Sequence, residues 1–393
     1  QCRDIISTKK EEKMKVSVIA NTSCDEINDK ELFTKLGGKL AGICYMPNNF
    51  EALENESEEK TLRRANVTKS SGHHSVFEHS FVTLYLEDVP KLFAMLLNNE
   101  RAYTTSEKSA RYTKMSVSGV EKELYEKWFD ILQKEITKNY GGLPYFSEKR
   151  IAKLAQENAR YFLSVFTPTS LAYTCSFRQL NYLYGWMKRI DEFASPLFKK
   201  LKPQAEQFCE YLEKLNLIDE DLVKGGDSRF FSIENKKFRK EFFSDCYSTK
   251  YEGSFSSFAQ AQRHRTLIYE LKQIEPPKYY VPKIIEKNDK LKSEWLDDMK
   301  KVEALTPQAQ LVEIYERGTP ENFLLKARER LCTAAQLEIM DQTKNTMQKF
   351  IEQTDDQEIQ DEMKKHSKAR CTSGYTCKEP CKFVDGINLE REI

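Results

Sequence analysis

The sequence has 393 residues, of which 62 are basic and 61 acidic, so its formal net charge is +1. This balance gives no strong field that would favour nucleic acid or an anionic membrane as a partner. The length indicates two domains. Residues 1–15 lack the apolar core of a secretory signal, and no run of 18 apolar residues predicts a membrane span. Ten cysteines are too few for a disulfide scaffold of this length, so we expect a cytoplasmic protein with free or metal-bound thiols.

The first half is predicted to mix strands with amphipathic helices. Alternating apolar and β-branched residues predict strands at residues 15–21 and 80–86. Residues 101–112 are polar and typical of a turn. Apolar residues at helical spacing predict helices at 30–45, 90–98, 121–139, 147–162, 177–190 and 201–217.

The composition changes at residues 219–227, an acidic segment with two adjacent glycines, and we place a domain boundary there. Residues 228–251 carry mixed strand signals. Residues 352–393 are polar and contain three closely spaced cysteines. Helical spacing predicts the remaining elements at 255–271, 288–305, 308–315 and 322–350.

Any cofactor phosphate is expected to be held by side chains. Only 14 glycines occur, about half the usual frequency, and neither GxGxxG nor GxxxxGK[ST] is present. A Rossmann or P-loop turn is therefore not predicted.

Four of the five histidines lie in two short segments. The first segment, GHHSVFEH at 72–79, places His73, His74 and His79 beside a glutamate. Such side chains can bind a metal, bind phosphate or transfer protons, although HExxH is absent. The alternative is an ordinary helix-to-strand junction.

The second histidine segment is QAQRHRT at 260–266, where Arg263, His264 and Arg265 are adjacent. Burying such a cluster is costly unless an anion compensates it, so a pyrophosphate ligand or a surface basic patch is expected. A hydroxyl and a guanidinium also lie close together in RAYTTSEKSARY at 101–112. Ser109 and Arg111 could clamp a phosphate there, or belong to a solvated loop.

Two segments in the last part of the sequence are the remaining candidates for a functional site. RERLCTAAQLEI at 328–339 contains Arg330 before a helical run, and by itself it is typical of a packing helix. The tail carries cysteines at looser spacing than usual zinc knuckles, so reduced thiols are the alternative to a structural zinc site. The candidate zinc ligands are Cys371, Cys377 and Cys381, with Cys332 or His366 as the fourth.

Together these segments resemble the flavin-dependent thymidylate synthases. That family's motifs include GHxSxxEH, QxxRHRxxSxNExSxRY and a late R-x-x-x-x-AQ-x-EI helix. The resemblance covers about residues 14–353 and also includes MKVSVIANT (14–22) and ARYFLSVFTPTSLAYTCSFRQL (159–180). The matching motifs are GHHSVFEH at 72–79, SEKSARY at 106–112, QAQRHRT at 260–266 and RLCTAAQLEI at 330–339.

The resemblance implies an α+β fold with two tandem domains, each a small antiparallel sheet packed with long helices. The first domain keeps SxRY but has Asn99 and Glu100 at the first Arg and His positions of RHR. The second keeps RHR and AQxEI but lacks SxRY. The expected divisions are an extension at 1–13, domains at 14–218 and 219–353, and a tail at 354–393.

The implied activity is reductive methylation of dUMP to dTMP, with FAD as cofactor and NADPH and methylene-tetrahydrofolate as co-substrates. Since each half keeps what the other has lost, the resemblance implies a composite active site and a homodimer of four domains. A pyrimidine hydroxymethylase with the same cofactors and a nucleotide-binding pseudoenzyme of the same fold are the alternatives.

The resemblance also assigns individual residues. Arg330, Arg263 and Glu107 are the implied catalytic residues. The implied FAD contacts are His73, Ser75, Glu107, Arg263, His264 and Arg265. The implied nucleotide contacts are Ser109, Arg111, Arg178, Gln260, Arg263 and Arg330. Ser176 replaces the asparagine of the family's NARSL segment, which puts that contact in doubt.

Overall fold

The computed structural model confirms an α+β fold with small antiparallel sheets. The chain forms two compact units, and each unit draws on two stretches of sequence. Unit 1 contains residues 1–108 and 168–234, and unit 2 contains residues 109–167 and 235–393. The structure describes residues 14–22, 30–45, 50–100, 102–110, 113, 117–227, 230–234, 247–264, 266–333, 335–355, 357–369 and 391–392.

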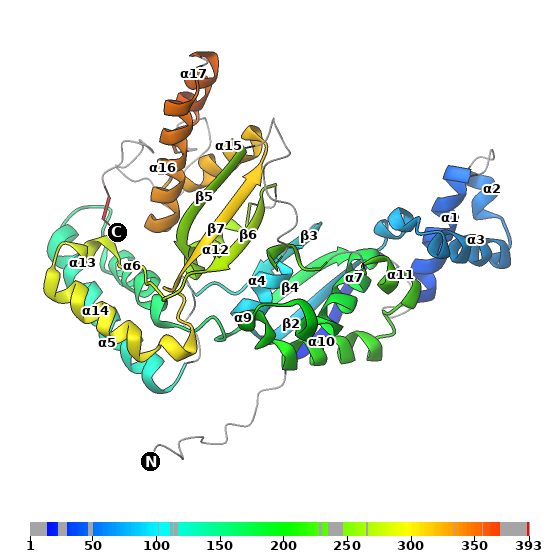
Figure 1. Ribbon diagram of the computed structural model, residues 1–393, viewed down its shortest axis with the longest axis horizontal. Coiled ribbons are helices and arrows are strands. Elements are labelled where there is room, and N and C mark those ends of the chain that lie inside the picture. Colours follow the sequence, from blue (N-terminus) through cyan, green and yellow to red (C-terminus); the bar gives the residue numbers. More distant parts are fainter. Residues whose placement is uncertain are drawn as a thin grey trace. The chain divides into compact units, whose positions relative to one another are not determined.

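Unit 1 is built on a four-stranded antiparallel sheet with the order β1-β2-β4-β3 (Figure 1). Val82, Leu84 and Leu86 of β2 are fully buried, as the alternating pattern requires. The strands are β1 (Lys15–Asn21), β2 (Phe81–Pro90), β3 (Tyr103–Glu107) and β4 (Pro168–Ser176).

Helices cover this sheet and extend from it. Helix α7 is largely buried, and Arg178 is the one residue from Phe177 to Met187 that is not in the buried class. It packs on β4, α10 and α11. The helices of unit 1 are α1 (Lys30–Tyr45), α2 (Phe50–Glu54), α3 (Glu58–Ser70), η1 (His74–Glu78), α4 (Lys91–Leu97), α7 (Phe177–Lys188), α8 (Ile190–Phe193), α9 (Pro196–Lys199), α10 (Lys202–Lys214), α11 (Glu220–Gly225) and η3 (Ser232–Glu234).

Unit 2 contains a three-stranded antiparallel sheet with the order β5-β7-β6 (Figure 1). Its strands are β5 (Tyr247–Ser254), β6 (Ile268–Gln273) and β7 (Leu311–Gly318). Its helices are α5 (Gly119–Tyr140), α6 (Glu148–Ala159), η2 (Arg160–Phe162), α12 (Phe255–Ala261), α13 (Lys283–Glu286), α14 (Asp289–Lys301), η4 (Glu303–Leu305), α15 (Pro320–Arg330), α16 (Leu337–Gln353) and α17 (Gln357–Lys365).

Helices from both halves of the sequence share one core in unit 2. Trp128 of α5 and Trp295 of α14 meet edge to face with centroids 4.8 Å apart, and Phe162 lies 4.6 Å from Trp295. All three rings are fully buried. The Trp128 indole donates to Asp298 Oδ2 at 3.1 Å, which satisfies its buried N–H. Residues 109–167 therefore pack with the second half, which differs from the contiguous division expected from the sequence.

The two halves nevertheless repeat one order of elements. In the first half, β2, α4, β3, the pair α5–α6, β4 and α7 follow one another. In the second half, β5, α12, β6, the pair α13–α14, β7 and α15 follow in the same order. In both sheets the third of these strands pairs between the other two, and all pairings are antiparallel.

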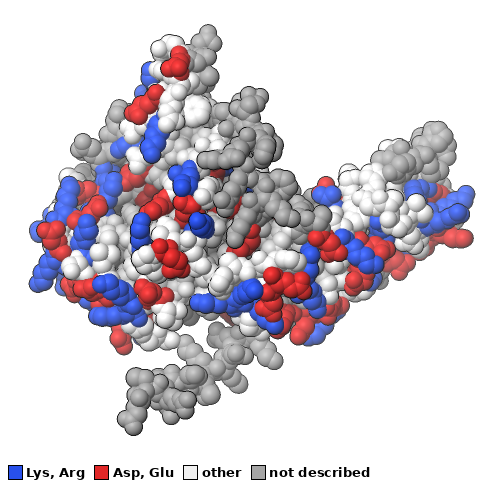
Figure 2. Space-filling model, in the orientation of Figure 1, with Lys and Arg blue, Asp and Glu red and all other residues white. Residues whose placement is uncertain are grey.

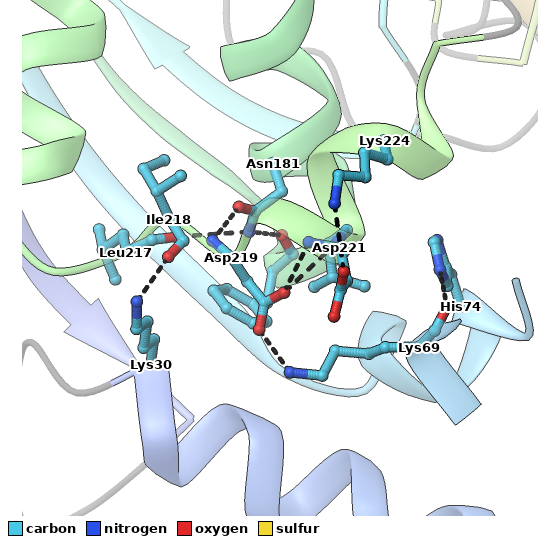
Figure 3. Close-up of polar contacts among 11 residues, drawn as sticks. Lys30, Lys69, His74, Asn181, Leu217, Ile218, Asp219, Asp221 and Lys224 are labelled. Atoms are coloured by element: carbon cyan, nitrogen blue, oxygen red, sulfur yellow. Dashed lines mark hydrogen bonds and ion pairs between the residues drawn. The ribbon is translucent and has the colours of Figure 1, made fainter. Parts of the chain in front are cut away.

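The domain boundary was expected at residues 219–227, but these residues form part of a folded element in unit 1. Asp219 begins α11 and accepts from the backbone N–H groups of Asp221 and Leu222 at 3.2 and 3.4 Å. Lys69 of α3 donates to the same carboxylate at 2.6 Å, as Figure 3 shows. A Cβ at Gly225 would lie 2.2 Å from the His74 ring, so this glycine allows close packing and is not a hinge.

Several predicted elements differ from the structure in the second half. Residues 311–318 form strand β7 and not a helix, and the helix predicted at 255–271 ends at Ala261 before strand β6. The long helix predicted at 322–350 is interrupted between α15 and α16. In the first half, residues 103–107 of the predicted turn form β3. The other predicted helices and strands of the first half are confirmed within a few residues.

Charged side chains of both signs are interspersed over the face shown in Figure 2, in agreement with the balanced net charge. No helix within the described residues is long and apolar enough to cross a membrane.

Candidate functional site

The RHR segment lies in the turn between α12 and β6 of unit 2. Helix α12 begins at Ser254, whose hydroxyl accepts from the N–H of Ser257 at 3.0 Å. The helix ends with His264 N–H donating to the Ala261 carbonyl at 2.9 Å. This local geometry sets Gln260 and Arg263 one helical turn apart on the same side. Arg265 lies outside the described residues.

Arg330, the last residue of α15, reaches this turn from another element. Its Nε donates to His264 Nε2 at 2.7 Å, and its Nη2 donates to the Gln260 carbonyl oxygen at 3.2 Å. The structure therefore brings together two motifs that are 66 residues apart in the sequence. Their assignment to one nucleotide site stays a prediction of the resemblance.

His264 is held in its neutral form. Burial is the main cause that lowers its pKa from 6.5 to about 2, and the charges of Arg330 and Lys326 add to this effect. The ring accepts a hydrogen bond from Arg330 and adds no positive charge to this turn. Arg263 and Arg330 therefore supply the permanent positive charge of this turn among the described residues.

A buried ion pair lies behind this site. Lys326 Nζ donates to Glu316 Oε2 at 2.6 Å, and both side chains are fully buried. The hydroxyl groups of Tyr247 and Tyr251 each donate to the same carboxylate at 2.9 Å. Gln342 accepts a further bond from Lys326 at 2.8 Å. Since every charge in this group is paired or hydrogen-bonded, its burial is tolerated.

Gln336, at the start of α16, is the centre of a buried hydrogen-bond network that the sequence did not predict. Its Oε1 accepts from Gln260 Nε2 and from Arg160, and its Nε2 donates to the Tyr161 hydroxyl. Tyr161 in turn donates to Glu338 Oε2 at 2.6 Å. The AQxEI motif contained the signal for these roles, but the motif alone does not show which buried partners its polar residues meet.

Glu338 ties this network to the start of α12. Its carboxylate accepts from the Ser254 backbone N–H and hydroxyl, each at 2.6 Å. Burial raises the pKa of Glu338, and the hydrogen bonds from Ser254 and Tyr161 oppose that rise. Ser254, which begins α12, and Glu338 of α16 thus position Gln260 together.

Gln260 and Arg263 each have one buried polar atom without a partner among the described residues. These atoms are Gln260 Oε1, an acceptor, and Arg263 Nη1, a donor. Gln260 is 9% exposed. Buried polar atoms are almost always hydrogen-bonded, so an unsatisfied donor and acceptor one helical turn apart indicate a site for a polar ligand.

The SxRY segment is only partly described. Ser109 begins a turn in which its carbonyl oxygen accepts from the Thr113 N–H at 2.9 Å. Gln156 of α6 donates to the carbonyl oxygens of Ala110 and Thr113, each at 3.2 Å. Helix α6 therefore anchors this turn in unit 2. Arg111 lies outside the described residues.

In unit 1 the GHHSVFEH segment forms η1 and meets the segment that resembles NARSL. Glu78 accepts an ion-paired hydrogen bond from Arg178 of α7. Arg178 Nε is buried without a partner among the described residues. His73 is half-buried directly before η1, and Ser75 is exposed within it. His74 is buried instead, and it contacts the Lys69 carbonyl at 2.8 Å and the Tyr182 hydroxyl at 3.3 Å.

Other polar residues of unit 1 are engaged structurally. Glu107 accepts from Lys91 of α4 at 2.5 Å. Glu100 is 3% exposed and accepts from the N–H of Ser232 at 2.6 Å and from its hydroxyl at 2.9 Å. Asn99 also donates to Ser232 at 2.8 Å. The two residues that replace Arg and His of RHR in the first half therefore bind a neighbouring segment.

The proposed zinc site finds no support among the described residues. Cys332 is a half-buried free thiol, whereas Cys371, Cys377 and Cys381 lie outside the described residues. No group of three or more potential metal ligands occurs in the part of the chain that the structure describes.

Comparison with known proteins agrees with the first-half motifs. The model of the thymidylate synthase complementing protein family matches residues 34–194. The flavin-dependent thymidylate synthase of Thermococcus onnurineus (strain NA1) is 27% identical over 126 residues, which are 29% of this chain and 49% of that protein. The enzyme of the same name from Pyrococcus furiosus is 26% identical over 149 residues, 35% of this chain and 57% of its own length. The chain thus spans about half the length of the curated relatives it matches.

A solved structure is similar over a larger region but at a low score. The UMP/dUMP methylase PolB from Streptomyces cacaoi, bound with 5-Br dUMP, is 15% identical and aligns with 57% of this chain and 98% of its own at a TM-score of 0.35. A score of this size establishes neither fold nor function.

Fold and motifs define an α+β protein in which motif residues from separate elements meet on the RHR turn. Residues 34–194 match the model of the thymidylate synthase complementing protein family. The RHR and AQxEI segments lie outside the matched residues. Their assignment depends on the contacts of Arg330 and Gln336 with the RHR turn described above.

Proposed function

We propose that the protein is a flavin-dependent methylase that converts dUMP to dTMP. The observation that carries this proposal is the contact of Arg330 with the RHR turn, beside the unsatisfied Gln260 Oε1 and Arg263 Nη1. A nucleotide supplies both an anion and polar base edges, so it would satisfy these atoms. The match of residues 34–194 to the family model supports the same proposal.

The proposed nucleotide contacts divide into residues that would bind the phosphate and a residue that would contact the base. Arg263 and Arg330, with Ser109 and Arg111, would hold the nucleotide, since guanidinium groups bind phosphate with two donors. Gln260 would contact the base. Glu107 and Arg178 are assigned by resemblance to the flavin and the nucleotide, respectively.

FAD fits the polar residues of unit 1. Arg178, which the resemblance assigns to the nucleotide, has a buried Nε donor without a partner among the described residues, so a polar ligand would also fit beside this segment. His73 and Ser75 lie on the same segment as Glu78, which binds Arg178. These residues would orient the flavin, which supplies the hydride chemistry when bound. NADPH and methylene-tetrahydrofolate are the proposed co-substrates.

We also propose that the chain is a tandem duplication with one composite active site per pair of domains. The repeated order of elements and the repeated sheet order support the duplication. The structural use of Asn99 and Glu100 supports loss of the nucleotide site in the first half. A homodimer would then bring SxRY of one domain to RHR of another.

Three measurements test the proposal. The visible spectrum of the purified protein, with a count of FAD per chain, should give one FAD per chain. Arg111→Ala should weaken dUMP binding and spare FAD, whereas Arg263→Ala should weaken both. A flavin lost in Arg111→Ala with unchanged dUMP affinity would contradict this division, and a monomeric mass in sedimentation would contradict the composite site.

A nucleotide-binding pseudoenzyme is the second candidate. It is favoured by one observation: Glu107, an implied catalytic residue, is already engaged by Lys91. A protein that stays colourless after FAD is added and the excess removed would support it. Mass spectrometry of the product from dUMP or dCMP would separate methylation from hydroxymethylation.

A further inference from the structure

His264 is only partly exposed to solvent, and its ring contacts a residue of the proposed site. Arg330 is bound at two points of the RHR turn, by the His264 ring and by the Gln260 carbonyl oxygen. A guanidinium held through both Nε and Nη2 has little freedom to rotate. The imidazole therefore sets the direction in which the remaining donors of Arg330 point.

The tautomer of the ring follows from the same contact. Arginine can only donate, so His264 Nε2 must carry a lone pair, and the ring proton must lie on Nδ1. A protonated ring would have no acceptor for Arg330.

The surrounding charges favour this neutral ring. Arg330 and Lys326 of α15 and Arg263 of the same turn are cations near it. Two carboxylates of this region are already engaged. Glu316 of β7 accepts from Lys326, Tyr247 and Tyr251, and Glu338 of α16 accepts from Ser254 and Tyr161. An imidazolium here would add a positive charge that no described carboxylate pairs with.

We propose that His264 is a positioning residue that holds Arg330 through a neutral imidazole with its proton on Nδ1, and that it does not act as a cation toward the cofactor pyrophosphate. The proposal rests on the assignment of Arg330 to the nucleotide site. Its consequence is that removal of the acceptor impairs nucleotide binding, whereas a change of pH between 5.5 and 8.5 leaves the ring unaltered.

The first half provides an independent parallel. At the same place, between α4 and β3, Glu100 is also an acceptor. It is buried, and it binds the N–H and hydroxyl of Ser232. This position thus carries a residue that fixes a neighbouring segment in both halves, although the two residues differ in charge.

The first test uses the full-length protein without added ligand. Nitrogen-15 NMR of the histidine rings, with His264→Gln to assign the signal, should show the proton on Nδ1 and no titration between pH 5.5 and 8.5. The Arg330 Nε–H should exchange slowly in the natural protein and quickly in His264→Phe. A proton on Nε2, or titration near pH 6.5, would overturn the proposal.

The second test measures dUMP binding. His264→Phe keeps a ring but loses the acceptor, and we expect its Kd for dUMP to rise about 10- to 100-fold, as for loss of a charged hydrogen bond. His264→Gln keeps an acceptor and should stay within about threefold. The pH dependence of FAD affinity should be the same in the natural protein and in His264→Gln.

Different results would refute the positioning role of His264 and the proposed function. Equal dUMP affinities for the Phe and Gln variants would refute the positioning role. A natural protein that binds no dUMP would refute the proposed function, and the tautomer and the Arg330 exchange rate would still decide whether His264 holds Arg330.

Discussion

Gln260 Nε2 and a guanidinium nitrogen of Arg160 both donate to the same atom, Oε1 of Gln336. Since arginine cannot accept, this shared contact fixes which end of the Gln336 amide is the oxygen. The end of Gln260 that meets it must then be the nitrogen. The buried carbonyl oxygen of Gln260 is therefore the end left for a ligand, and it requires a donor from that ligand.

This arrangement predicts that Gln336→Met weakens nucleotide binding about tenfold, although Gln336 itself is not assigned a contact with the nucleotide. The variant removes the acceptor that orients Gln260, and it leaves the buried donors of Gln260 and Arg160 unsatisfied, at a cost of about 1–3 kcal/mol of stability. Isothermal titration with dUMP and urea unfolding measure the two effects. Gln353→Met, an exposed residue at the end of the same helix, is the control and should change neither. Equal dUMP affinity in the two variants would refute the orienting role.

The pKa of His264 predicts a specific dependence of stability on pH. The unfolded ring, with a pKa of 6.5, binds a proton that the folded ring, with a pKa of about 2, does not bind. The free energy of unfolding therefore decreases as pH falls below 6.5, by up to about 1.4 kcal/mol per pH unit. Urea unfolding should show that the natural protein loses about 2 kcal/mol more than His264→Gln between pH 7 and pH 5. Parallel curves for both proteins would mean that the folded ring takes up the proton.

Because Asn99 and Glu100 bind a neighbouring segment, we predict that Arg and His at these two positions do not restore a cofactor site in the first half. The double variant Asn99→Arg, Glu100→His removes the buried acceptor for Ser232 and should cost about 1–3 kcal/mol of stability. It should also leave the number of FAD molecules per chain unchanged. Glu100→Gln keeps an acceptor and is the control, with a smaller expected loss in thermal unfolding. A second FAD per chain in the double variant would contradict structural replacement.

Much of the first half was predictable because its periodicities are clear. The strands near residues 15–21 and 80–90 alternate, and α5 presents Leu124, Trp128, Leu132 and Ile136 on one face. The strand β7 was missed although it alternates, with Val312 and Ile314 buried, because Leu311 and Tyr315 also fit helical spacing over so short a segment. Short apolar segments remain ambiguous until a neighbouring strand provides the pairing.

The site was predictable in its residue types more than in its contacts. The resemblance assigned Arg263 and Arg330 to one nucleotide site, and the structure places Arg330 on the turn that contains Arg263. The resemblance could not show that His264 is neutral, because burial and nearby cations determine that property. The participation of Arg160 was also unpredictable, since it depends on which half of the chain the first helical pair packs against.

The shared core of unit 2 predicts how the chain can be divided. Residues 219–393 correspond to the second domain and tail expected from the sequence, but alone they lack Trp128 and Phe162, which pack on Trp295. Removing a large buried partner costs about 3–5 kcal/mol, a major part of a domain's total stability. This fragment should show no near-ultraviolet circular dichroism from fixed tryptophans. A matched protein that joins residues 109–167 to 235–393 through a flexible linker should show it, and a folded 219–393 fragment would contradict the shared core.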